Sequence, residues 1–359
     1  RDKSAELESV KSKLEEYKRL ADTDPLTHIW NRRAFDKRIA NIYNGTFPRR
    51  DPAHDWTQPL AGNVSATLWQ TYFPFSDVPK VVAPGSGFVI SANASPFQST
   101  SDPFNPREDA FPPTMGIETG LSNRARRALS LIESDRSITP ADFKSSKFHV
   151  CYAPDSDLAV LIKDLAERNY AGDPLMEEAG QILRRYDLCT DKDNRRAPLA
   201  LLTAITVLQA DEQGRPRPDP AAVLRGFATR MLEYFGRLDP TWGEVGRLRR
   251  GLVDLPLSGG PDALRDIEFA PGVDDNGTTH AVGGDALTVL STWNRDGQWA
   301  VESVVPYGSS SSESSPHYSD QAPLFADGRL KELPLTESAL MEQATGIERP
   351  GKPDDEIPQ

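Results

Sequence analysis

Proline residues limit the length of every helix that this chain can form. The chain contains 30 prolines, and a proline inside a helix removes a backbone hydrogen bond and clashes with the preceding turn. Five of them exclude a continuous helix over residues 41–82, namely Pro48, Pro52, Pro59, Pro74 and Pro79. Helical periodicity dominates residues 124–250, where further prolines separate about five or six predicted helices. These prolines are Pro140, Pro174, Pro198, Pro218 and Pro240.

Strand patterns follow this helical stretch. From Thr279 onward the residues favour strands, and segments 286–293 and 298–305 flank Asn294-Arg295-Asp296-Gly297, a turn typical of a β-hairpin. Upstream, the turn at 85–87 leads into residues 88–92, which are predicted to form a short buried strand. The sequence therefore predicts an α+β fold with a large helical region.

The first forty residues have a different character. Apolar residues at Leu7, Val10, Leu14, Tyr17 and Ala21 follow the alternating three- and four-residue spacing of a heptad seam. This spacing predicts a coiled-coil-like helix that is too short to dimerise stably alone. The sequence therefore leaves the oligomeric state open, with a weak helix-mediated dimer as one possibility. We expect three parts: a linker at 1–40, a main region at 41–345 and a flexible tail at 346–359.

Composition excludes several classes of protein. The net charge of −12 disfavours a nucleic-acid binder, which usually carries a basic face. The longest apolar runs are far shorter than the ~20 residues of a membrane span, and no charged-then-apolar leader opens the chain. Five histidines lack the spacing of a zinc hydrolase. Two cysteines, Cys151 and Cys189, could form one disulfide, and the sequence does not decide whether they do.

Residues 24–35 carry the first resemblance. Their sequence, DPLTHIWNRRAF, resembles the start of GGDEF diguanylate cyclase domains, which commonly follows a helical signalling linker. His28 stands where that family usually has glycine. The catalytic loop of the family is absent downstream, and the closest string, at 283–287, lacks the Glu-Phe pair. The resemblance therefore implies a cyclase-like beginning without cyclase activity.

Four ordered blocks from about residue 41 carry the second resemblance. They are YNGTFPRRDP at 43–52 followed by Asp55-Trp56, PGSGFVISANASP at 84–96, NRARR at 123–127, and HYSDQ at 317–321. In this order and spacing they resemble the penicillin acylase family, specifically the C-terminal half of its β-chain, over about residues 41–345. The resemblance implies an Ntn-hydrolase fold, an αββα sandwich of which this chain would hold a part.

The family resemblance implies a chemistry and two site residues. In Ntn-hydrolases a serine at the chain N-terminus attacks an amide carbonyl, and its own α-amino group acts as the base. Asn93 matches the asparagine that donates to the oxyanion, although Ala94 replaces the second asparagine usual there. Arg124 matches an arginine that holds the hydrogen-bond network near the nucleophile. The expected substrate is a linear acyl amide, with the acyl group left open.

The resemblance also implies an optional metal ion. Some family members hold a structural calcium through carboxylates and a backbone carbonyl. Asp102 lies near a matching ligand position, and Pro52 could supply the carbonyl. No other cofactor is expected.

The nucleophile is the main departure from the family. It should lie farther upstream of Asn93 than this chain extends, and no serine in residues 41–92 has a suitable cleavage context. We therefore expect a fusion of a cyclase linker to a truncated β-chain that is inactive alone and would need a complementary acylase chain carrying the N-terminal serine. Two alternatives stay open: a non-catalytic binding or scaffold chimera, and a signalling module acting through residues 1–40. Family members are usually periplasmic or secreted, but the sequence leaves the compartment open.

Overall fold

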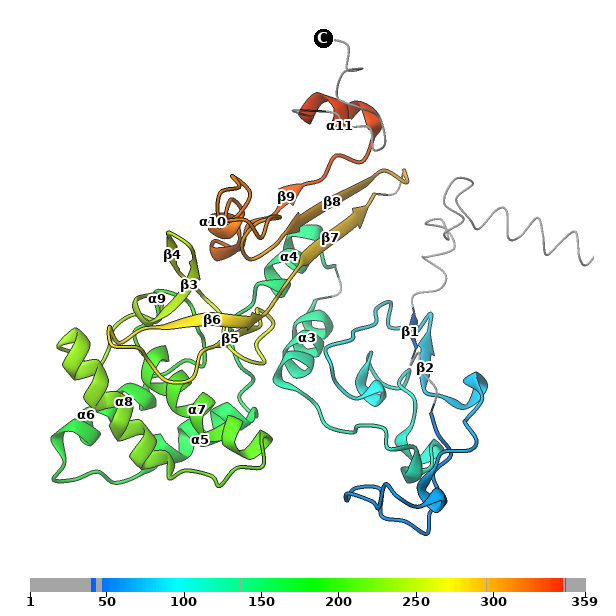
Figure 1. Ribbon diagram of the computed structural model, residues 1–359, viewed down its shortest axis with the longest axis horizontal. Helices are drawn as coiled ribbons and strands as arrows, with labels where there is room; N and C mark the ends of the chain where they lie inside the picture. Colours follow the sequence, from blue (N-terminus) through cyan, green and yellow to red (C-terminus); the bar gives the residue numbers. More distant parts are fainter. Residues whose placement is uncertain (1–39, 43–46, 136, 295, 345, 347–359) are drawn as a thin grey trace, which may run out of the picture.

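The structure is a computed structural model of the 359-residue chain. It describes residues 40–42, 47–135, 137–294, 296–344 and 346. The predicted heptad helix and the GGDEF-like segment within 1–40 lie outside the described residues, apart from residue 40 itself. The same holds for the predicted tail after residue 346. The remaining residues form a mixed α+β fold, as the sequence predicts (Figure 1).

Most of the described α-helices lie in the middle of the sequence, between residues 123 and 245. The α-helices are α3 (Asn123–Ser134), α4 (Pro140–Lys147), α5 (Asp157–Glu167), α6 (Pro174–Arg184), α7 (Ala197–Glu212), α8 (Pro220–Phe235), α9 (Trp242–Val245), α10 (Ala322–Ala326) and α11 (Glu337–Gln343). Short 3₁₀ helices lie at Ser65–Thr67, Phe75–Asp77, Pro96–Gln98, Glu108–Ala110 and Pro113–Met115. The described residues between Asn123 and Val245 thus form seven helices, one more than the upper estimate, because the four-residue α9 has no periodicity of its own.

Prolines begin several of these helices as well as separating them. In α4, α6 and α8 the first residue is proline, whose missing N–H is not needed at that position. The residues just before them, Thr139, Asp173 and Asp219, accept backbone N–H groups of the first turn through their side chains. Proline followed by a helical pattern therefore marks a helix start.

The strands of the described residues form three separate sheets. They are β1 (Ala40–Ile42), β2 (Lys80–Val82), β3 (Gly246–Arg250), β4 (Val253–Pro256), β5 (Ile267–Phe269), β6 (Thr279–Gly284), β7 (Thr288–Trp293), β8 (Trp299–Val304) and β9 (Lys331–Glu332). The sheet orders are β1-β2, β4-β3-β6-β5 and β7-β8-β9. Among these described strands, only the β3–β6 pair is parallel.

Two strand predictions have opposite outcomes. The hairpin is confirmed, since β7 and β8 pair antiparallel from Thr288↔Val304 to Trp293↔Trp299. The strand predicted at 88–92 is wrong, because this segment is irregular and joins no ladder. Contacts with a neighbouring loop replace the ladder: the Thr100 hydroxyl donates to the Phe88 carbonyl at 2.8 Å, and the Ile90 N–H donates to the Ser99 carbonyl at 2.7 Å. After the helices, strands begin at Gly246 in β3, whereas the sequence predicts them only from Thr279 onward.

The main core lies around α7. The first eight residues of α7 are all buried, and this helix packs against α5, α6, α8 and α9. Helices α5–α8 group on one side of the β3–β6 region, whereas the segment with β1 and β2 lies on the other side of α3 (Figure 1). In the part of the chain that the structure describes, no helix is long and apolar enough to cross a membrane.

A disulfide joins Cys151 and Cys189, which settles the pairing that the sequence left open. On either side of it, the Tyr152 N–H donates to the Leu188 carbonyl at 2.9 Å, and the Thr190 N–H donates to the Val150 carbonyl at 3.1 Å. The closed loop contains α5 and α6 entirely. The disulfide therefore joins the two ends of the segment that carries these two core helices.

Candidate functional site

The segment that carries Asn93 is tied to the start of α3. Ser122 caps this helix by accepting the Ala125 N–H at 3.2 Å. Its hydroxyl donates in turn to the Ala92 carbonyl at 3.2 Å. A second link joins the Ser95 N–H to the Gly120 carbonyl, also at 3.2 Å. These bonds bring together two stretches of sequence that each hold one predicted site residue.

Asn93 has a left-handed backbone, with φ of 50°. Asparagine adopts this conformation more easily than most residues. The residue is exposed, and its side-chain amide has no hydrogen-bond partner within the residues that the structure describes. Sequence reasoning expected Asn93 at the end of a buried strand, whereas it follows an irregular segment held by both backbone and side-chain hydrogen bonds. Its amide is therefore available to a ligand.

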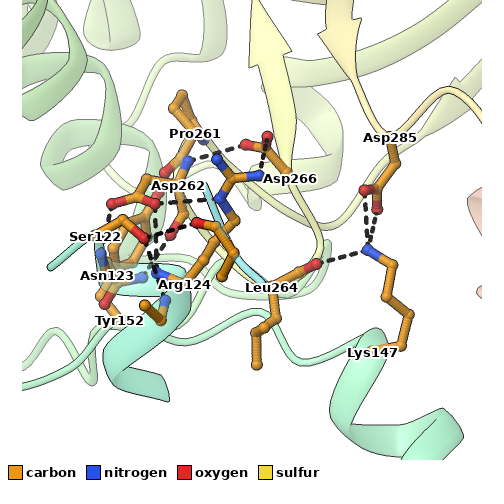
Figure 2. Close-up of polar contacts among 12 residues, drawn as sticks. Ser122, Asn123, Arg124, Lys147, Tyr152, Pro261, Asp262, Leu264, Asp266 and Asp285 are labelled. Atoms are coloured by element: carbon orange, nitrogen blue, oxygen red, sulfur yellow. Dashed lines mark hydrogen bonds and ion pairs between the residues drawn. The ribbon is translucent and has the colours of Figure 1, made fainter. Parts of the chain in front are cut away.

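Arg124 lies in the first turn of α3 and faces two carboxylates (Figure 2). The Asp262 Oδ1 atom lies 3.3 Å from the Arg124 Nε atom, and the Asp266 Oδ2 atom lies 3.2 Å from Nη1. Asp262 also accepts the backbone N–H groups of Asn123 at 2.6 Å and of Arg124 at 3.3 Å. We call Asn123, Arg124, Asp262 and Asp266 the Arg124 cluster.

The loop between β4 and β5 supplies both carboxylates of this cluster. The Asp262 N–H donates to Asp266 Oδ1 at 2.9 Å, and the Tyr152 hydroxyl donates to the Pro261 carbonyl at 2.6 Å. At the other end of the loop, the Lys147 ammonium of α4 donates to the Leu264 carbonyl and pairs with Asp285, both at 2.7 Å (Figure 2). Contacts from several elements therefore hold the loop in place.

Asn93 and the Arg124 cluster line one cavity of about 1100 Å³. Tyr152 and Glu268 contribute further polar groups, and Leu161 of α5 and Leu208 of α7 form part of an apolar wall. Most of the residues that line this cavity are polar or charged. It shares with small-molecule sites the convergence of polar groups in a concave space, but not their mainly apolar lining. The two predicted catalytic residues, 31 positions apart in the sequence, thus face a shared space.

Burial shifts the acidity of two carboxyls in this cavity. It raises the pKa of Asp266 above its ordinary value of 3.8, and the Arg124 guanidinium opposes that effect, while Asp285 and Asp262 add to it. Burial also raises the pKa of Glu268, and the neighbouring charges of Asp266 and Glu212 act in the same direction. Raised carboxyl pKa values in a cavity are typical of functional sites, although structural ion pairs also produce them.

The raised pKa of Asp266 predicts a pH dependence of stability. A folded state that binds this proton more tightly than the unfolded chain gains stability as the pH falls through the raised pKa, and loses it again as the pH rises. We expect wild type to gain stability relative to Asp266→Asn between neutral pH and about pH 4. Urea unfolding at several pH values measures this difference. Parallel stability curves for the two proteins would contradict the prediction.

Asp102 does not lie in a ready metal site. Its carboxylate is exposed and accepts a hydrogen bond from the Asn105 amide at 3.1 Å. Over residues 40–346, the described His, Cys, Asp and Glu side chains form no group of three or more that could hold a metal ion. Since the predicted ligands include a backbone carbonyl, this does not test the site, and the calcium at Asp102 stays a prediction.

Sequence reasoning missed Asp262 and Asp266. The turn at Gly259-Gly260-Pro261 marks a loop, and two carboxylates follow it four residues apart. Nothing in this pattern points to Arg124, which lies 138 residues before Asp262. Only the packing of the β4–β5 loop against α3 brings them together.

Comparisons with known proteins identify the family. The model of the penicillin amidase family matches residues 31–342. The chain belongs to the penicillin amidase family. The match starts within the segment that resembles GGDEF domains, and the comparisons give the GGDEF resemblance no support. The comparison with curated proteins gave no match.

A solved structure also resembles this penicillin amidase family member. It is the thermostable penicillin G acylase from Alcaligenes faecalis in an orthorhombic form, at 15% sequence identity and a TM-score of 0.49. The match covers 87% of this chain and 65% of that one. The chain thus spans slightly less than two thirds of the acylase chain that it matches.

Proposed function

We propose that this chain is the C-terminal part of an amide hydrolase that cleaves linear acyl amides. The observation that carries the proposal is the shared cavity, which both Asn93 and Arg124 line. The apolar wall from Leu161 and Leu208 suits a hydrocarbon acyl group. Family membership supplies the reaction class.

In the proposed reaction the serine hydroxyl of an N-terminal residue attacks the amide carbonyl, and its α-amino group takes the proton. The Asn93 amide donates to the oxyanion of the tetrahedral intermediate. Collapse of this intermediate releases the amine and leaves an acyl-enzyme ester, which water then hydrolyses to the acid. Arg124 holds the hydrogen bonds around the reacting groups.

We infer that the serine lies on an acylase segment outside residues 41–345. That segment would also complete an αββα sandwich with the sheets described above. The disulfide is consistent with an oxidising compartment, such as the periplasm or the exterior of the cell. A calcium ion at Asp102 would need ligands from outside the described residues.

The test is acid release from two 4-nitroanilides, one aryl-acetyl and one fatty-acyl, by the chain joined to its serine-bearing segment. Asn93→Ala should lower kcat by about 10²–10³-fold, because it removes one oxyanion donor. Asn169→Ala, in an exposed loop between α5 and α6, is the matched control and should retain the wild-type kcat. A full kcat in Asn93→Ala would contradict the proposed role. Acid release by residues 1–359 alone would place a nucleophile within this chain.

A further inference from the structure

We propose that Asp262 is a positioning residue of the site, which orients Arg124 so that one terminal nitrogen of its guanidinium faces the reacting amide. This inference rests on the proposed function for its catalytic part. Its structural part, that Asp262 fixes the orientation of Arg124, rests on the contacts of the described residues.

Asp262 binds both the backbone and the side chain of its target. One carboxylate oxygen accepts the Asn123 N–H at 2.6 Å. The other lies 3.3 Å from both the N–H nitrogen and the Nε atom of Arg124. A carboxylate at a helix N-terminus is stabilised by the unpaired N–H groups of the first turn. Because the same carboxylate caps α3 and binds Nε, it fixes the guanidinium relative to the helix that carries it.

Asp262 is itself held in one position. Its φ of 55° is left-handed, which aspartate tolerates better than most residues. Its carbonyl accepts the Asn123 amide at 2.7 Å, and the buried Asn123 side chain also accepts the Ala153 N–H at 2.7 Å. Exposed ion pairs between long side chains usually contribute little because both partners move. Here the acceptor, Asp262, has a short side chain that binds backbone N–H groups of α3, and its own carbonyl is hydrogen-bonded. It can therefore fix the orientation of the Arg124 guanidinium.

Asp266 binds a second nitrogen of the same guanidinium, with its Oδ2 atom 3.2 Å from Nη1. Arg124 Nη2 has no acceptor within the part of the chain that the structure describes. Arg124 also lines the cavity. Two carboxylates thus occupy Nε and Nη1 and leave Nη2 for a ligand. The two carboxylates also offset the positive charge of the guanidinium. Its Nη2 group can therefore donate a hydrogen bond in a fixed direction, while the cluster attracts anions only weakly.

Two measurements on Asp262→Asn test the proposal. Asparagine has the same shape and tolerates the left-handed backbone, but it carries no charge. The first measurement is hydrogen exchange of the Arg124 Nε–H group by ¹⁵N NMR, with the signal assigned by its loss in Arg124→Lys. We expect exchange to become at least about tenfold faster in Asp262→Asn, since a charge-assisted bond is replaced by a weaker one.

The second measurement is turnover of an aryl-acetyl 4-nitroanilide by the chain joined to its serine-bearing segment. We expect kcat to fall by about 10–100-fold with KM changed by less than about threefold, as for a misplaced catalytic group. Asp155→Asn is the matched control, because it removes the 2.7 Å pair with Arg126 on the same helix and does not touch Arg124. It should leave both measurements unchanged.

The outcomes separate this inference from the proposed function. The exchange measurement needs no turnover, so unchanged Arg124 exchange in Asp262→Asn overturns the inference in every case. An active wild type with equal kcat in Asp262→Asn overturns it as well. A wild type without turnover overturns the proposed function, while faster exchange would still support the orienting role. If Asp262→Asn does not fold, Asp266→Asn removes the charged partner of Nη1, while the remaining amide oxygen can still accept the Asp262 N–H. Faster Arg124 exchange and a lower kcat are then expected at smaller size, and no change in either would overturn the inference.

Discussion

Replacing Trp242 with alanine is expected to lower the free energy of unfolding by about 3–5 kcal/mol, the range for truncating a large buried aromatic residue. Trp242 is fully buried and meets Phe269 edge to face, with ring centroids 4.9 Å apart. Its indole N–H donates to the Gly259 carbonyl at 3.1 Å. The substitution would therefore leave both a cavity and a buried carbonyl without its donor.

Denaturant unfolding of the purified chain measures this loss. Trp242→Phe is the matched comparison, because it keeps an aromatic ring but not the hydrogen bond, and should cost about 1–3 kcal/mol. A loss below about 1 kcal/mol in Trp242→Ala would show that the site collapses around the smaller side chain. Gly259 starts the loop that carries Asp262, so Trp242→Ala should also speed hydrogen exchange at Arg124.

Removing the disulfide is expected to cost a similar amount. The bond joins Cys151 and Cys189 across a separation of 38 residues, and the loop-entropy relation for that length gives about 4 kcal/mol. The stabilisation arises mainly because the bond restricts the unfolded chain. Unfolding of the Cys151→Ala/Cys189→Ala double variant in denaturant tests the value.

Reductant supplies the control for this second prediction. The chain has two cysteines, so reductant should destabilise wild type and leave the double variant unchanged. Equal stability of the oxidised wild type and the double variant would contradict the prediction. A fully reduced protein from its native source would argue against the oxidising compartment proposed above.

The sequence predicted the parts of the fold that local chemistry controls. Asn294 and Gly297 lie at the two ends of a turn whose backbone preferences act over four residues. The prediction of the β7–β8 hairpin is therefore confirmed. Prolines separate the helices as predicted, with Pro140 and Pro174 at the first residues of α4 and α6, because the effect of proline on a helix is also local. The 88–92 strand failed, because a strand needs a partner strand and local preference does not supply one.

The candidate site divides in the same way. Asn93 and Arg124 stand in motifs of adjacent residues, and a resemblance to a family could point to both of them from the sequence. The penicillin amidase family itself was also recognisable from the order of four short blocks. These motifs do not predict which side chains surround Asn93 and Arg124 in the folded protein.

The amino-acid sequence by itself determined that prolines separate the helices, and it determined the hairpin, the family and the two residues predicted to act in the site. Only the tertiary structure decided that Asp262 and Asp266 meet Arg124, that Ser122 ties the Asn93 segment to α3, and that Cys151 pairs with Cys189. The physical reason is the distance along the sequence over which each interaction acts. Proline, turn and capping preferences act between neighbours in the chain, whereas an ion pair across 138 residues forms only where packing of the core brings a loop against a helix.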